Sequence, residues 1–135
     1  MLRKRIAYFG SILLLVSLVA AVGCDSGPKT IEIQGTVTLD GSPLGGVQVE
    51  YIPDDTTLTN GRGRADPATG EYKIVYPGEG NLGVPAGTYT VSITPDDVVE
   101  GTPVSVPAKY QGTNSELKVT VPSADGSYDL ALTSS

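Results

Sequence analysis

The residues after position 29 predict an all-β domain: a sandwich of two sheets built from six or seven short strands. Apolar and polar residues alternate there in short bursts, as they do in strands with one buried face. Glycine, proline, asparagine and aspartate separate the bursts, and these residue types favour turns. No apolar spacing of 3.6 residues occurs beyond the N-terminal leader. Two packed sheets satisfy such a pattern without helices.

Each expected strand is an alternating run that a turn or a proline ends. In chain order we expect strands at 31–39, 47–51, 71–76, 88–94, 116–121 and 127–132, with a weaker one around 103–108. Residues 54–64 are so polar and rich in glycine that we expect a loop there. Because loops on a rigid sandwich tend to carry binding, we expect the contact surface at 54–64, 77–83 and 95–101.

Residues 1–23 have the pattern of a signal peptide. A basic start, Arg3-Lys4-Arg5, precedes an apolar stretch at 6–22. The stretch ends in Ala21-Val22-Gly23-Cys24, which resembles the bacterial lipobox. That resemblance implies cleavage before Cys24 and attachment of acyl chains such as palmitate to this cysteine. The expected organisation is a signal peptide at 1–23, a lipidated cysteine and short tether at 24–29, and one domain at 30–135.

Two other interpretations of the leader stay open. An apolar stretch of about 18 residues can just span a bilayer as an uncleaved anchor. Ordinary signal cleavage would instead leave Cys24 with a free thiol. The abrupt end of apolar character at the cysteine favours the lipoprotein. We therefore expect an exported protein, lipid-anchored to a bacterial membrane and facing the periplasm or the cell exterior; Asp25 leaves inner and outer membrane open.

Composition excludes several kinds of chemistry. The leader holds three of the nine basic residues and none of the 15 acidic ones, so the remaining chain has six against 15, a net charge of −9. Such a charge repels nucleic acid. The chain has no histidine and a single cysteine, whereas zinc sites, Ser-His-Asp catalysis and disulfide frameworks need those residues. We expect no cofactor and no enzyme activity.

Four segments carry a family resemblance that spans most of the domain. They are IQGTVTLDGSPLGGVQV (33–49), ADPATGEY (65–72), VPAGTYTV (84–91) and VPAKYQGTNSELKVTV (106–121). In this order they resemble the carboxypeptidase regulatory-like domains, including versions found in exported bacterial lipoproteins. The resemblance implies a single transthyretin-like (prealbumin-like) Greek-key β-sandwich of about seven strands. It also implies an accessory or adhesive module, because most such domains are not catalysts.

Paired aspartates are the weak candidates for a metal site. Calcium accepts carboxylate ligands in flexible geometry, and Asp54, Asp55, Asp96 and Asp97 supply carboxylates. None of them follows the spacing of a calcium-binding loop. Each pair lies where a turn is expected, and aspartate favours turns by bonding nearby backbone amides. The turn-forming role is the favoured interpretation.

Two tyrosines are candidate ligand contacts. Tyr72, Tyr89 and Tyr128 fall on the apolar phase of their strands and are expected in the core. Tyr76 at a strand end and Tyr110 in a loop could be exposed and stack on a sugar, although packing is the favoured role. The sequence thus predicts a non-catalytic, membrane-anchored binding or structural module with an envelope protein as partner. The alternative is a carbohydrate-binding module that recognises polysaccharide.

Overall fold

The computed structural model describes residues 28–78, 81–97, 101 and 104–135. The leader, Cys24 and the start of the tether lie outside these residues. Almost all regular structure is β-strand, with one short 3-10 helix, η1 (Ala108–Tyr110). The strands are β1 (Thr30–Ile31), β2 (Gln34–Leu39), β3 (Ser42–Pro43), β4 (Val47–Pro53), β5 (Gly61–Arg64), β6 (Glu71–Lys73), β7 (Val75–Tyr76), β8 (Asn81–Leu82), β9 (Val84–Pro85), β10 (Gly87–Pro95), β11 (Lys118–Val121) and β12 (Leu130–Leu132).

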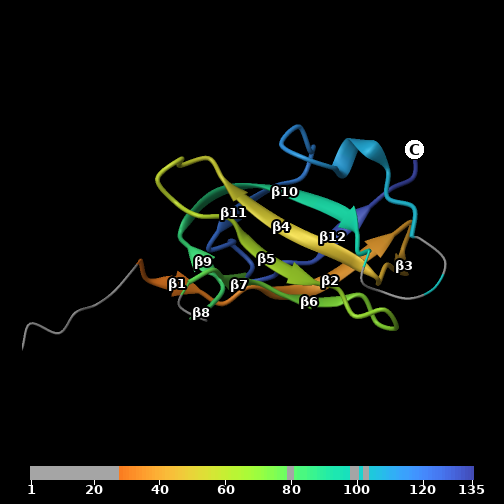
Figure 1. Cartoon of the computed structure of the whole chain (residues 1–135), viewed down its shortest axis with the longest axis horizontal. Coiled ribbons are helices and arrows are strands. Elements are labelled where there is room, and N and C mark those ends of the chain that lie inside the picture. Colours follow the sequence, from red (N-terminus) through yellow and green to blue (C-terminus); the bar gives the residue numbers. More distant parts are fainter. Residues whose placement is uncertain (1–27, 79–80, 98–100, 102–103) are drawn as a thin grey trace, which may run out of the picture.

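The strands pack as a sandwich of two main sheets (Figure 1). The larger sheet has the order β11-β10-β4-β5-β7-β8, and its longest ladder pairs β10 with β4 from Tyr89↔Pro53 to Pro95↔Val47. The other sheet has the order β12-β2-β3, with β6 paired to β2. The pair β12 and β2 is parallel, and the other strand pairs are antiparallel. The all-β sandwich expected from the sequence is confirmed.

The expected strand at 71–76 is divided in two at Ile74. The Ile74 N–H donates to the Ile33 carbonyl at 3.0 Å, and the Ile74 carbonyl accepts from the Gly83 N–H at 2.6 Å. On one side β6 pairs with β2, and on the other Arg62↔Val75 pairs β5 with β7. The chain therefore passes from one sheet to the other at this residue.

The prediction of a loop at 54–64 is wrong for residues 61–64, because they form β5 inside the larger sheet. Its inward positions are glycines. A methyl carbon at Gly61 would lie 2.4 Å from Val84 Cγ1, and one at Gly63 would lie 1.9 Å from the Lys73 carbonyl oxygen. Since only glycine fits this close approach, the inward face of β5 carries no apolar side chain. The usual alternation is absent for that reason.

Other strand predictions hold in part. The run at 31–39 is interrupted at Glu32 and Ile33, so that β1 pairs with β9 while β2 joins the other sheet. The prediction of a weak strand at 103–108 is wrong for the described residues 104–107. These residues are irregular and lead into η1. The two-residue strands β3, β8 and β9 were not expected, because alternation cannot be recognised over two residues.

The core fills the space between the two sheets. Tyr51, Tyr89, Ile33 and Ile74 are among its largest fully buried side chains. On β10, Tyr89, Val91 and Ile93 are fully buried, and Thr90 and Ser92 between them are buried too, so both faces of this strand are covered. The expected burial of Tyr72, Tyr89 and Tyr128 is confirmed, with 2%, 0% and 6% of each residue exposed.

The N-terminal strand fixes where the tether enters the domain. In the pair of β1 with β9, Thr30 lies opposite Pro85. The hairpin loop after β4 lies at this same end, because the Thr59 N–H donates to the Tyr76 hydroxyl at 3.1 Å. We call this the tether end (Figure 1, where β1, β8 and β9 lie together). The turn between β2 and β3 lies at the opposite end.

Candidate functional site

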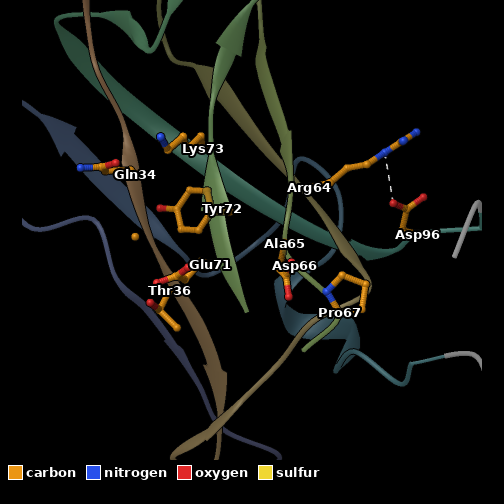
Figure 2. Close-up of a pocket in the computed structure, with 11 residues that line it drawn as sticks. Gln34, Thr36, Arg64, Ala65, Asp66, Pro67, Glu71, Tyr72, Lys73 and Asp96 are labelled. Carbon is orange, nitrogen blue, oxygen red and sulfur yellow. Dashed lines mark ion pairs between the residues drawn. The ribbon is translucent and has the colours of Figure 1, made fainter. Parts of the chain in front are cut away.

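A hollow with a volume of about 750 Å³ lies on the outer surface where β6 joins β2 to the end of β5. We call it the β6 hollow (Figure 2). It is lined by Gln34, Gly35, Thr36, Arg64, Ala65, Asp66, Pro67, Glu71, Tyr72, Lys73 and Asp96. These residues come from β2, β5, β6, the turn after β5 and the end of β10.

Strand register places the polar side chains of the hollow in rows. In the ladder of β2 with β6, Gln34 lies opposite Lys73 and Thr36 lies opposite Glu71. Glu71 and Lys73 are exposed, and Tyr72 between them is buried. Because side chains alternate across a strand, the two charged residues face the hollow and the tyrosine faces the core.

An ion pair forms one wall of the hollow. Arg64 Nε lies 3.1 Å from Asp96 Oδ2, and the side chain of Asp96 is only 7% exposed against 61% for Arg64. Figure 2 shows Arg64 reaching across to Asp96. The Asp96 N–H also donates to the Gly46 carbonyl at 2.9 Å, which holds the end of β10 beside the start of β4. The guanidinium therefore compensates a nearly buried carboxylate and still faces solvent.

The turn after β5 forms another wall and is held by Asp66. One oxygen of its carboxylate, Oδ1, accepts the Ala68 N–H at 2.8 Å and the Thr69 N–H at 3.0 Å. These hydrogen bonds lower the pKa of Asp66 below its usual value, because they favour the ionised form. Asp66 is therefore ionised, and its carboxylate holds the turn that forms this wall of the hollow.

The charges of the hollow nearly balance. Arg64 and Lys73 face three carboxylates, those of Asp66, Glu71 and Asp96. Gln34 and Thr36 add neutral donors and acceptors. The hydroxyl of Tyr72 is turned away, since it donates to the Tyr128 carbonyl. Such a lining fits a neutral or zwitterionic polar ligand, or a polar protein surface, better than a strongly charged one.

Both tyrosines that the sequence offered as exposed ligand contacts are buried. Tyr76 is 8% exposed and Tyr110 is 6% exposed. The Tyr76 hydroxyl accepts the Thr59 N–H, and the Tyr110 hydroxyl accepts the Thr133 N–H at 3.0 Å. The packing role favoured from the sequence agrees with this burial, and the weaker alternative of exposed ligand contacts is wrong, because these rings hold loop segments against the sandwich. They have no free face for stacking on a sugar.

Three core tyrosines form a cluster that the sequence did not predict. The ring centroids of Tyr51 and Tyr72 are 6.5 Å apart, and those of Tyr51 and Tyr89 are 5.8 Å apart. Burial raises the pKa of Tyr51 and of Tyr89 to about 12, and it raises that of Tyr72 as well. The Tyr89 hydroxyl donates to the Pro85 carbonyl at 2.6 Å. All three phenols are therefore neutral, structural groups at physiological pH.

The structure separates the weak calcium candidates. Asp54 follows β4, and Asp96 follows β10; because these strands are antiparallel, the two aspartate pairs lie at opposite ends of the sheet. Asp55 Oδ1 accepts both the N–H and the hydroxyl of Thr57, at 2.9 and 2.7 Å, and these bonds lower its pKa. Among the described residues, no three His, Cys, Asp or Glu side chains are placed to hold a metal ion.

The three loops expected to form one contact surface also lie apart. The loop after β4 and the described residues of 77–83 lie at the tether end, whereas Asp96, which follows β10, lies at the opposite end. Arg62 and Arg64, which fall within the loop expected at 54–64, are on β5. Arg62 Nη2 lies 2.9 Å from Glu50 Oε1. The prediction that all three loops form a single contact surface is therefore wrong.

The sequence missed the β6 hollow because its lining is brought together from distant segments. Gln34 and Arg64 had no motif that joined them. One available signal was the polar phase of the strand pattern at 34, 36, 71 and 73. Polar residues at such positions are usually only solvated, so this signal could not distinguish a binding face.

Comparison of the chain with family models, with curated proteins and with solved structures found no match. The fold and the hollow therefore define a class only: an all-β sandwich with a polar hollow on its outer surface. The resemblance to carboxypeptidase regulatory-like domains stays a prediction. Within the described ranges, no helix has the length and apolar character needed to cross a bilayer.

Proposed function

We propose that this chain is an exported bacterial lipoprotein whose β-sandwich is a non-catalytic binding or structural module of the cell envelope. The observation that carries the proposal is the position of Cys24. It is the only cysteine, and it ends the apolar leader directly before a short polar tether. Each buried methylene of an acyl chain contributes about 0.8 kcal/mol, so a cysteine with several chains stays in the membrane.

The domain is suited to a binding or structural role. Its two sheets share one core, and Tyr51 and Tyr72 join them by a buried hydrogen bond of 2.8 Å. Most donors and acceptors of the β6 hollow, those of Gln34, Thr36, Arg64, Glu71 and Lys73, are on strands, which favours fixed geometry. The absence of histidine from the sequence supports a non-catalytic role. We propose that the β6 hollow is the contact surface for an envelope protein.

The polysaccharide alternative, in the form that uses Tyr76 and Tyr110, loses its contact residues because both rings are buried. A sugar-binding surface usually needs an exposed aromatic face. The hollow has only Tyr72, which is 2% exposed. The protein-binding form of the module is therefore the one that we propose.

Crosslinking in intact cells followed by mass spectrometry tests this function. We expect the full-length chain to recover a reproducible set of envelope proteins, and Cys24→Ala to lose it. Lys73→Ala, in the hollow, should reduce recovery several-fold. Thr120→Ala is the matched control, since Thr120 is exposed on β11 at the other edge of the larger sheet. Equal recovery by the wild type and Cys24→Ala would contradict the proposal.

A further inference from the structure

Two exposed apolar side chains lie side by side at the edge of the larger sheet. Val75 is 42% exposed and Leu82 is 45% exposed, and they are the large apolar residues that stay exposed in the described part of the chain. They are direct partners in the pair of β7 with β8. Residues opposite each other in an antiparallel pair have Cβ atoms about 5 Å apart, so the two side chains form one small apolar patch.

The patch is at the tether end of the domain. Gly83 directly follows Leu82, and its backbone packs so closely on β1 that an added methyl carbon would lie 1.7 Å from the Ile31 carbonyl oxygen. The strand β9 that follows pairs with β1. In Figure 1, β8 and β9 lie beside β1, which begins at Thr30 directly after the described tether residues Pro28 and Lys29. The patch and the tether therefore emerge close together.

The length of the tether sets the distance to the membrane. Cys24 precedes Thr30 by six positions. Even fully extended, six residues span only about 20 Å. A domain attached through Cys24 must therefore keep its tether end near the headgroups of the bilayer.

We propose that Val75 and Leu82 rest on the lipid surface that holds the acyl chains of Cys24. This inference rests on the proposed function, because it requires the acylated cysteine. The apolar pair enters the boundary between headgroups and acyl chains and orients the sandwich, with the turn between β2 and β3 pointing away from the membrane. Since the chain after the leader has a net charge of −9, the contact is apolar, and anionic lipids weaken it.

Fluorescence quenching by lipids that carry a nitroxide headgroup tests this orientation. The lipidated chain is purified and placed in phosphatidylcholine vesicles. Because the sulfur of Cys24 is acylated, one added cysteine takes the fluorophore alone. Pro77→Cys places it beside the patch, and Ser42→Cys places it at the opposite end; both positions are exposed. We expect quenching at position 77 to exceed that at position 42 at least threefold.

The variant V75T/L82T then tests the patch itself. Threonine is β-branched, which suits a strand, but it is polar, so quenching at position 77 should fall to the level seen at 42. Equal quenching at both positions in otherwise unchanged protein would overturn the proposal. So would a V75T/L82T variant that is quenched like its parent. A change in the size of acyl-free protein on V75T/L82T substitution, seen by light scattering, would assign the patch to a second copy instead.

The same experiment distinguishes failure of the proposed function from failure of the proposed orientation. If the N-terminal peptide carries no acyl group, the chain does not stay on the vesicles at all. If it is acylated and stays attached while both reporters are quenched equally, only the orientation is overturned.

Discussion

At the scale of single residues, a chain of hydroxyl hydrogen bonds joins the two sheets. Tyr72 on β6 donates to the carbonyl of Tyr128, just before β12. The hydroxyls of Tyr51 and Tyr72 are 2.8 Å apart, and Tyr51 must be the donor because the proton of Tyr72 is already used. Tyr72 is therefore the central member of the chain, and Tyr51 is its end.

Phenylalanine substitutions should separate these two roles. Tyr72→Phe leaves the Tyr51 donor and the Tyr128 carbonyl without partners, so we expect a loss of about 2 to 4 kcal/mol in the free energy of unfolding. Tyr51→Phe leaves the bond from Tyr72 to Tyr128 intact and should cost about 1 kcal/mol. Urea denaturation of protein produced without residues 1–24 measures both. An equal or larger loss for Tyr51→Phe would contradict this order.

The same tyrosines predict sensitivity to alkali. The pKa of Tyr51 is about 12 in the folded protein, against an ordinary value of 10.0. Because the unfolded chain releases this proton first, stability is unaffected below pH 10 and falls as the pH rises to 12. Urea midpoints measured between pH 8 and 12 should show this fall, and Tyr51→Phe should make it shallower. A midpoint that stays constant from pH 10 to 12 would show that burial does not shift this pKa.

Among side chains, the sequence predicts the apolar ones best. Ile33, Val37 and the inward face of β10 follow simple alternation, and all are buried. The burial of Tyr76 and Tyr110 was harder to predict, because a tyrosine can be buried by a loop that folds over it. That loop packing depends on contacts such as Thr133 to Tyr110, which no local pattern records.

At the scale of elements, glycine decides where strands approach one another. Gly83 has a φ of 91° and packs on the Ile31 carbonyl, whereas Gly41 has a φ of 83° with nothing within 4 Å of an added methyl carbon. Both positions therefore disfavour a side chain through their backbone conformation. Only Gly83 adds a steric clash with β1.

This pair gives a matched test of the β1 contact. Gly41→Ala should lower the free energy of unfolding by about 1 to 2 kcal/mol, the cost of a left-handed conformation for a residue with a Cβ. Gly83→Ala should cost clearly more and should increase hydrogen exchange at the amides of β1. If both variants lost the same stability and β1 kept its protection, the close packing of β1 would be refuted.

Long strands with an apolar face were predictable, and the strand β5 was not. Four of the expected strands overlap β4, β10, β11 and β12, because each has inward apolar side chains. The inward positions of β5 are Gly61 and Gly63, so its membership of the sheet depends on space left by Val84 and Lys73. The same dependence explains why the β6 hollow could not be predicted: its position follows from β5 and β6 lying side by side.

At the scale of the whole molecule, the tether and the hollow define two different regions. The tether end carries β1, β8 and the patch of Val75 and Leu82. The β6 hollow lies on the outer surface of the sandwich, between β2 and the end of β5. An anchored domain can therefore rest on lipid at one end and keep its polar hollow open to a partner.

Attachment through Cys24 is the claim on which both proposals depend. The most direct test is mass spectrometry of the N-terminal peptide from protein extracted from the membranes of the cells that produce it. We expect a peptide that begins at Cys24 and carries the mass of a diacylglyceryl group and an N-acyl chain. A peptide that retains residues 1–23, or a Cys24 with a free thiol, would contradict the lipoprotein proposal.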